Sequence, residues 1–123
     1  MSAESYQGPE RRQHLRVDRH IPFKIAREEG DIVAETVNIS RSGAYCRVNT
    51  RIPLMTKLKI QLLLPLRKGN KSATKTIHCQ GVVVRIEPST EEGFFNTAIF
   101  FNEIAQRDAE LINDYVDSCR ENK

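Results

Sequence analysis

The fold is decided by residues 20–40, which read HIPFKIAREEGDIVAETVNIS. Over residues 20–27, apolar side chains occupy every second position, at Ile21, Phe23 and Ile25. This period of two is typical of a half-buried strand. Residues 28–31 are polar, contain Gly30 and supply turn chemistry, and residues 32–40 read as a second strand. The stretch therefore predicts an antiparallel hairpin.

Four further strands follow from the same alternation and from the turn residues between them. They are expected at residues 43–48, 57–64, 74–86 and 94–101. Pro65 is expected to end one of these strands, and residues 67–72 are expected to form a solvated loop. Gly81 predicts a bulge or bend inside the long strand.

The C-terminal part of the chain has a different period. Its apolar residues recur at steps of three and four, at Ile104, Leu111, Ile112, Tyr115, Val116 and Cys119. This spacing predicts an amphipathic helix over residues 104–120, with Asn102 as its N-cap. Six consecutive strands followed by one helix predict a mainly β fold: a six-stranded antiparallel β-barrel with a C-terminal α-helix.

Length and composition fit one soluble domain. The chain has 123 residues, of which 39% are hydrophobic and 28% charged. The net charge of +3 is too small for a protein that coats a nucleic acid polymer or an anionic membrane with its whole surface. Residues 1–19 lack apolar periodicity and are expected to be a flexible tail ahead of a domain at residues 20–123. The absence of a secretory signal and of a long apolar run predicts a cytoplasmic protein without membrane insertion.

Signals of catalysis or metal binding are weak. The three cysteines, Cys46, Cys79 and Cys119, are odd in number and widely spaced, so they are expected to be reduced and partly buried. The histidines have no metal-ligand spacing, and the chain contains neither a nucleophile elbow nor a phosphate-binding loop. The sequence therefore predicts a protein that is not an enzyme and that has neither a metal nor a cofactor.

Two short motifs stand out. Arg12 and Arg16 form R-x-x-x-R, and residues 38–43 form [DN]-x-S-x-x-G with Asn38, Ser40 and Gly43. The first is expected by chance roughly once in a chain of this composition, and it recurs at residues 47 and 51. The second is expected only ~0.03 times by chance, so it is much more specific.

The predicted hairpin brings the two motifs together. A turn centred on residues 29–31 would pair Asn38 with Pro22 and Ser40 with His20. The arginine segment comes directly before His20, and it would therefore lie beside Asn38 and Ser40.

The strand period predicts which of these side chains face outward. The inward face of residues 32–40 is expected to carry Val33, Val37 and Ile39. Asn38 and Ser40 would then point together to the outer face, and Gly43 could take the positive φ of a tight turn. Guanidinium groups near an amide and a hydroxyl suit a guanine nucleotide, because arginine binds phosphates and the O6/N7 edge of guanine and also stacks on purines.

On these two motifs and the strand pattern, the sequence resembles the PilZ domain family, the bacterial receptor module for cyclic di-GMP. The resemblance covers residues 10–120. It implies that Arg12 and Arg16 bind phosphates and guanine, that Asn38 and Ser40 contact the nucleotide, and that Gly43 shapes the turn. Arg11 stands where the family tunes ligand stoichiometry, which implies two ligand molecules per chain.

Three classes of function are compatible with this sequence. The first is a signalling receptor that binds cyclic di-GMP and relays the bound state to a protein partner. The second is an adaptor of the same fold that does not depend on nucleotide, against which the retained arginines argue. The third is an RNA-binding barrel, which would need exposed aromatics. The aromatics Phe94, Phe95, Phe100 and Phe101 fall in apolar context and are expected in the core, so the receptor is favoured.

Overall fold

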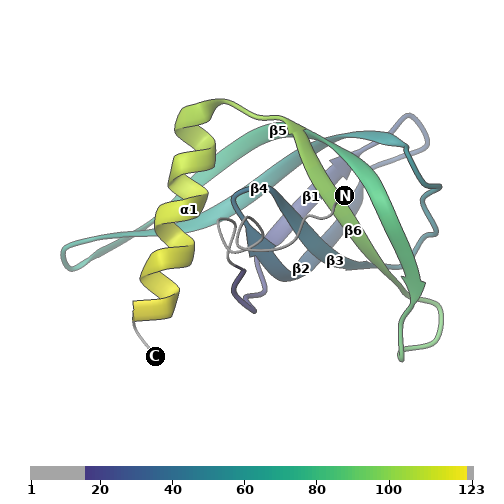
Figure 1. The fold of residues 1–123 in the computed structure, drawn as a ribbon, viewed down its shortest axis with the longest axis horizontal. Coiled ribbons are helices and arrows are strands. Elements are labelled where there is room, and N and C mark those ends of the chain that lie inside the picture. The colour runs from purple at the N-terminus through teal and green to yellow at the C-terminus, as the bar shows by residue number, and fades with distance from the viewer. Residues whose placement is uncertain (1–15, 122–123) are drawn as a thin grey trace, which may run out of the picture.

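The computed structural model describes residues 16–121 as six antiparallel strands that close into a barrel, followed by one helix (Figure 1). The strand order around the barrel is β1-β2-β3-β6-β5-β4. The elements are β1 (Pro22–Ala26), β2 (Ile32–Ser40), β3 (Gly43–Val48), β4 (Lys57–Lys68), β5 (Lys71–Pro88), β6 (Phe95–Glu103) and α1 (Gln106–Glu121). The predicted fold class is confirmed.

Apolar side chains from every strand fill the barrel. Those below 2% exposure include Ile21, Ile25, Ile39, Leu62, Leu64, Ile77 and Val83. Each fully buried side chain of this size stabilises the fold by roughly 1.5 to 3 kcal/mol relative to an exposed one. Helix α1 adds Ile112 and Val116 to the same core and contacts β2 and β4. The helix therefore lies against the barrel wall, as Figure 1 shows.

The helix begins later than its apolar period indicates. Strand β6 continues to Glu103, which pairs with Gln80 of β5, so Asn102 lies in the strand and the predicted N-cap is wrong. The carbonyl of Ala105 accepts the first helical bonds, from the amides of Asp108 and Ala109. Sheet pairing takes precedence over the side-chain capping preference here.

Strands β4 and β5 form a long ribbon that projects from the barrel (Figure 1). The predicted loop over residues 67–72 is wrong, since the strands meet at a turn around Gly69, whose φ is 61°. The predicted strand end at Pro65 is also wrong, because Pro65 pairs with Thr74. Strand β1 pairs only with residues 59–62 of β4, so Pro65 lies where no described strand pairs with the second edge of β4, a position that tolerates proline.

The set of β2 side chains that points into the barrel switches at a β-bulge. The β2–β3 register shifts between Thr36 and Asn38. Before the shift Ile32 and Thr36 are buried, after it Ile39 is buried, and Val33 is 77% exposed. The prediction that Val33 shares the inward face with Ile39 is therefore wrong, because one extra residue reverses the alternation.

The β1–β2 hairpin is registered differently from the prediction. Pro22 pairs with Glu35 rather than with Asn38. The amide of Gly30 donates to the carbonyl of Arg27, which centres the turn one to two residues earlier than expected. The shift of pairing by three residues also separates Ser40 from His20.

Other sequence expectations agree with the structure. The three cysteines are free and buried, and burial raises the pKa of Cys79 to about 12. A register shift between Gln80 and Val82 confirms the bulge at Gly81. Within residues 16–121, no helix combines the length and the apolar character that crossing a membrane requires.

Candidate functional site

The segment before β1 is paired with the barrel. Val17 and Ile39 exchange two backbone hydrogen bonds of 3.0 Å, and the Val17 side chain is only 9% exposed. The paired part of the chain thus begins three residues before residue 20, where the domain was expected to start. Residues 16–19 were predicted to belong to a flexible tail. They are held on the barrel instead, because the Val17 side chain is buried and its backbone makes two hydrogen bonds.

Arg16 joins the two motifs. Its Nη1 donates to Oδ1 of Asn38 at 3.0 Å and to the carbonyl oxygen of Gly43 at 3.4 Å. The expected proximity of the arginine segment to Asn38 is therefore present, although the register that produces it differs from the predicted one. Both acceptors are neutral, and no ion pair between described residues includes Arg16. No carboxylate among residues 16–121 therefore compensates the guanidinium charge beside the turn.

The surroundings of Arg16 disfavour its positive charge. Partial burial lowers the pKa of the guanidinium from its ordinary value, and the positive charge of Arg85 lowers this pKa further. Arginine stays protonated at physiological pH in spite of such shifts. The charge is therefore held at an electrostatic cost that an anion would relieve.

Ser40 is buried rather than open to a ligand. Its exposed fraction is 0%, and its Oγ accepts from the amide of Ser42 at 3.2 Å and lies 3.1 Å from the Ser42 Oγ. The hydroxyl therefore closes the turn between β2 and β3, in the manner of side chains that hydrogen-bond the backbone two residues on.

Gly43 serves the site by close approach rather than by a positive φ. The described glycines with positive φ are Gly30, Gly69 and Gly93, so the predicted conformation of Gly43 is wrong. A Cβ at Gly43 would clash with the carbonyl oxygen of Ile99 on β6. The absence of a side chain lets β3 and β6 approach closely.

Two of the candidate residues cannot be placed. Arg11 and Arg12 lie outside the described residues, as does most of the predicted tail. Their assignment to the site rests on the sequence motif alone.

Several neighbours of the site were not singled out from the sequence. Tyr45 on β3 pairs with Asn38, Ala98 on β6 pairs with Tyr45, and Arg85 on β5 pairs with Ala98. These residues make one row across four adjacent strands. Sequence periodicity could place each of them on a strand, but the pairing of β3 with β6 and of β6 with β5 was needed to align them.

Tyr45 and Arg85 are tied together by Glu87. The Tyr45 hydroxyl donates to Oε1 of Glu87 at 2.6 Å, and this bond, with burial, raises the pKa of Tyr45. Nε of Arg85 lies 3.7 Å from Oε2 of Glu87, and the guanidinium carbon lies 5.6 Å from the centre of the Tyr45 ring. Three side chains on two strands thus fix one another.

Two aromatics expected in the core, Phe94 and Phe100, lie outside it. Phe101 is buried, but Phe100 is 48% exposed. Phe100 pairs with Gly43 and with Val82, so it stands on the outer face beside the turn of the second motif. Strict alternation along β6 places only one of two consecutive phenylalanines inside the barrel.

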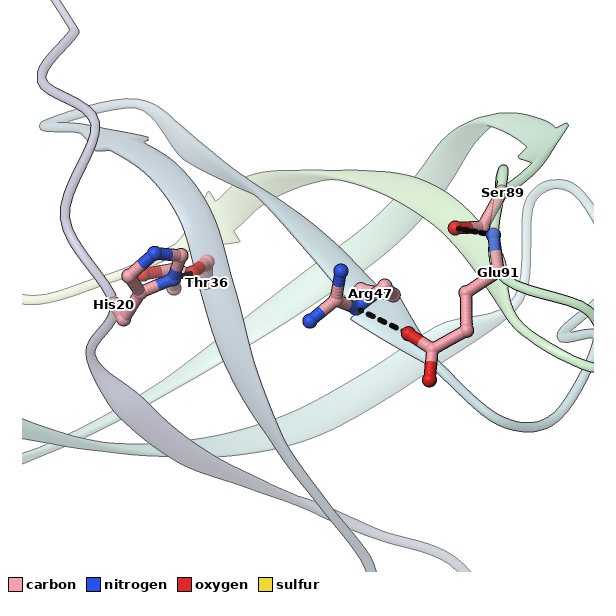
Figure 2. A network of polar contacts seen from close by, with 5 residues as sticks. All are labelled: His20, Thr36, Arg47, Ser89 and Glu91. Atoms are coloured by element: carbon pink, nitrogen blue, oxygen red, sulfur yellow. Dashed lines mark hydrogen bonds and ion pairs between the residues drawn. The ribbon is translucent and has the colours of Figure 1, made fainter.

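A separate hollow of about 360 Å³ opens at the other end of β2 and β3, and its lining includes His20, Arg47 and Phe94. Figure 2 shows the polar contacts around it. Nδ1 of His20 lies 3.1 Å from the Thr36 carbonyl oxygen, and Nε of Arg47 lies 3.6 Å from Oε1 of Glu91. Arg47 belongs to the second R-x-x-x-R, and its guanidinium also covers the Phe94 ring at 6.0 Å.

The described part of the chain contains no group of three His, Cys, Asp or Glu side chains that could hold a metal ion. The candidate site instead consists of guanidinium, amide, aromatic and backbone groups on the outer face of β2, β3, β6 and β5. Such groups bind planar bases and phosphates.

Comparison with solved structures supports the topology. The inhibitor of motility MotI/DgrA of Bacillus subtilis is similar with a TM-score of 0.80 and 25% identity, over 92% of this chain and 52% of that one. YcgR of Escherichia coli in complex with c-di-GMP has a TM-score of 0.71 and 9% identity, over 91% of this chain and 47% of that one. The PilZ domain of YcgR with c-di-GMP has a TM-score of 0.65 and 10% identity, over 91% and 93% of the two chains.

The chain spans about half the length of the MotI/DgrA and YcgR chains. No curated protein matches it. The family model described as PilZ domain matches residues 10–118, which include both motifs and almost all of the barrel and helix. Together with the six-stranded barrel, this match shows that the chain belongs to the PilZ domain family.

Proposed function

We propose that this protein is a receptor that binds cyclic di-GMP on the outer face of its barrel. The observation that carries the proposal is the contact of Arg16 with Asn38 and Gly43, which joins the two motifs at one point. A structure of the family member YcgR with c-di-GMP supports the same ligand class.

Arg16 has the donors that such a ligand needs. A guanidinium carries five N–H donors, and both contacts in this structure use Nη1. Nε and Nη2 make no hydrogen bond to the described residues, and we assign them to a phosphate or to the O6/N7 edge of guanine, to which arginine binds with two parallel hydrogen bonds. The uncompensated charge favours a ligand with phosphates over a neutral nucleoside.

Asn38 and Ser40 take different roles. Oδ1 of Asn38 orients Arg16, which leaves the amide nitrogen as a donor for a carbonyl oxygen of the base. Ser40 acts in this proposal by fixing the turn that presents Gly43 and Arg16, since its hydroxyl is engaged with Ser42. Arg11 and Arg12 are proposed as further ligands on the strength of the motif.

Relay of the bound state to a protein partner is the second part of the proposal. The chain spans only about half of the MotI/DgrA and YcgR chains, and the proposed relay uses a surface of this domain. A ligand held between Arg16 and the residues before it would bring the N-terminal residues against the barrel and create a new surface there.

Calorimetric titration with cyclic di-GMP, and with GTP and cyclic di-AMP as controls, tests the binding proposal. We expect saturable binding of cyclic di-GMP with two molecules per chain, and weak or no binding of the controls. Arg11→Leu should reduce the stoichiometry to one. No binding of cyclic di-GMP to folded protein would overturn the receptor and favour the nucleotide-independent adaptor.

Hydrogen exchange tests the ordering step. The Val17 amide bonds to Ile39 in the free protein, so it should be protected with or without ligand. The amides of residues 11–15 should gain protection only when cyclic di-GMP is present. Unchanged exchange at residues 11–15 under saturating ligand would remove the relay mechanism while leaving binding itself intact.

A further inference from the structure

Strands β4 and β5 lie in a part of the chain whose positive charge is hidden by the small net charge. The chain has 16 acidic residues, and none of them lies within residues 36–86, which hold 10 of the 19 lysines and arginines. Lys57, Lys59, Lys71 and Lys75 are exposed, and no ion pair between described residues includes any of them. The β4–β5 ribbon is therefore a cationic surface without a counter-charge in the described part of the chain.

The distal half of this ribbon has no described strand beside either edge. Strand β1 pairs with residues 59–62 of β4, and β6 pairs with β5 only from Gln80 onward, so residues 71–79 of β5 pair with β4 alone among residues 16–121. Figure 1 shows this part of the ribbon extending away from the barrel. An open strand edge offers backbone N–H and C=O groups to another chain.

The direction of the β5 backbone groups follows from the contacts of Val83. Its N–H donates to the carbonyl oxygen of Thr56 at 3.1 Å, and its carbonyl oxygen accepts from the amide of Met55 at 2.7 Å, so both groups of Val83 face the β4 side. The β4–β5 register continues from there to the tip without a shift. Because adjacent residues of a strand direct these groups to opposite sides, Thr74 and Thr76 direct theirs to the open edge.

The two edges of the ribbon are not equivalent. Pro65 of β4 pairs with Thr74, and because proline has no N–H, the open edge of β4 lacks a donor at that position. Proline on an edge strand discourages pairing with another chain. Residues 71–79 of β5 contain no proline, and lysine is their only formally charged residue. Lysines on an edge repel a second copy of the same edge and attract an acidic strand, so the β5 edge suits an acidic partner.

The composition of the ribbon favours a protein over other anionic partners. No Phe, Tyr or Trp lies within residues 46–93, whereas such side chains are typical of surfaces that bind single-stranded nucleic acid or insert into a membrane interface. A strand added to an open edge pairs with both its N–H and its C=O groups, which phosphates cannot do because they only accept. Lys71 and Lys75 are four residues apart and share one face of β5, so acidic residues with the same spacing would lie opposite them.

We propose that residues 71–77 of β5 accept an extended segment of a protein partner as an additional strand, with acidic side chains four residues apart opposite Lys71 and Lys75. About 26 Å of strand separate Thr74 from Val82, which is paired across β6 with the candidate site. The docking edge is therefore distinct from the nucleotide site. Its role as the anchor of a signalling partner rests on the proposed relay.

Magnetic resonance titration of isotope-labelled protein without nucleotide tests the inference. The probe is the capped synthetic peptide Thr-Glu-Thr-Val-Thr-Glu-Thr, and we expect the largest amide shifts at residues 71–77. The control peptide Thr-Glu-Thr-Val-Glu-Thr-Thr has the same composition but places its glutamates on opposite faces of a strand, and it should bind about three- to ten-fold more weakly. Absence of shifts at residues 71–77 would overturn the docking edge, and equal affinities of the two peptides would overturn the spacing.

Two double variants separate the edge from general positive charge. Lys71→Gln with Lys75→Gln should weaken binding of the first peptide about three- to ten-fold. Lys57→Gln with Lys59→Gln removes the same charge from the part of β4 that pairs with residues 80–82, and it should leave the affinity unchanged. Equal losses in the two double variants would overturn the site.

Thr74→Pro tests the strand addition itself. It removes one outward N–H and keeps the β4–β5 ladder, so peptide binding should be lost, whereas Thr74→Val keeps the N–H and should bind like wild type. Wild-type affinity of Thr74→Pro would overturn strand addition. If Thr74→Pro does not fold, protection of the Thr74 and Thr76 amides from hydrogen exchange on peptide binding to the wild-type protein decides the same point, and unchanged exchange overturns strand addition.

Two further titrations keep this inference apart from the proposed function. The Lys71→Gln and Lys75→Gln double variant should bind cyclic di-GMP like wild type. Failure of the wild-type protein to bind cyclic di-GMP refutes the proposed function and leaves the peptide result standing, whereas failure of the peptide to bind refutes only this inference. Duplex DNA that binds the same edge more tightly than the peptide at physiological salt would overturn the proposal in favour of a nucleic acid partner.

Discussion

The two R-x-x-x-R segments put arginines into opposite electrostatic situations. Arg16 of the first segment bonds to two neutral oxygens, those of Asn38 and of the Gly43 backbone. Arg47 of the second pairs with the Glu91 carboxylate (Figure 2) and also covers the Phe94 ring. Equal spacing in the sequence therefore produces one arginine without an ion-pair partner in the described part of the chain and one whose charge is already paired.

This difference shows that the spacing of the arginines alone does not identify the binding site. A guanidinium that already has a carboxylate partner gains less from a phosphate, because the new contact replaces an existing one. Arg16 has no such competitor among the described residues. The identity of the acceptors, rather than the interval between arginines, distinguishes the candidate site from the chance copy.

The strongest test of the comparison is Arg16→Ala. A charge-assisted hydrogen bond contributes roughly 1.5 to 3 kcal/mol, so the affinity for cyclic di-GMP should fall about ten- to a hundred-fold. The barrel should remain folded, since Val17 and not Arg16 packs into the core. Calorimetry at constant salt measures the change. A comparable loss for Arg47→Ala would erase the distinction between the two segments.

Gly43→Ala probes the support beneath Arg16. The added methyl group would clash with the Ile99 carbonyl oxygen, so β3 and β6 must separate, at a cost of about 1 to 3 kcal/mol in unfolding free energy. The Gly43 carbonyl that contacts Arg16 would move with β3, and binding should weaken as well. Ile25→Val, a core change on β1, serves as the stability-matched control and should leave affinity unchanged.

The buried thiol of Cys46, between the candidate site and Arg47, gives a prediction for the stability of the protein at high pH. Cys46 lies on β3 between Tyr45 and Arg47, and burial raises its pKa while the charge of Arg16 lowers it. Above pH 9.0 the unfolded chain loses this proton and the native protein keeps it. Stability is therefore fully present below pH 9.0 and should fall by up to about 1.4 kcal/mol per pH unit above it for this thiol.

Urea unfolding between pH 8 and pH 11 measures that slope. Cys46→Ala should reduce the slope and leave the affinity for cyclic di-GMP at pH 7.5 intact, because the thiol faces the core. An identical slope in wild type and Cys46→Ala would show that other groups cause the loss of stability.

Asn38→Ala should have a smaller effect than Arg16→Ala. It removes the hydrogen bond that the charged Arg16 guanidinium donates to the Asn38 amide oxygen and that orients Arg16, so affinity should fall roughly two- to ten-fold. If Asn38→Ala binds like wild type, the orienting role of its amide is refuted.

Arg51→Ala should have the smallest effect. Arg51 is exposed in the loop between β3 and β4, and its removal should change affinity by less than about two-fold. An effect as large as that of Arg16→Ala would mean that general positive charge, and not the site, attracts the ligand.

The sequence predicts most of the fold because its strands carry clear alternation. The bounds of β2 and β3 agree with the expected residues 32–40 and 43–48. The prediction from sequence fails where strand pairing rather than periodicity determines the end of a strand. Strand β4 continues through Pro65, and β6 continues through Asn102. Neither the free edge of β4 nor the length of the β5–β6 ladder is visible in a single sequence.

The site was predicted in part. The contact between Arg16 and Asn38 was expected, but from a hairpin register that is wrong by three residues. The turn over residues 27–31 is polar throughout, so no apolar side chain marks its centre. The bulge at Val37 is equally hidden, since valine suits either face, and it is the bulge that decides which side chains of β2 point outward.

The Val17–Ile39 bridge has a consequence for how tightly a multidentate ligand is held. Arg12 precedes Arg16 by four residues, so covalent geometry keeps its Cα within about 14 Å of that of Arg16. Once Arg16 has captured a nucleotide, contact with Arg12 becomes an intramolecular event with an effective concentration of order millimolar or higher. Because the bridge holds the residue next to Arg16 on the barrel, a substitution that breaks it without touching any arginine, such as Val17→Gly, should loosen both arginines from the site and speed ligand dissociation.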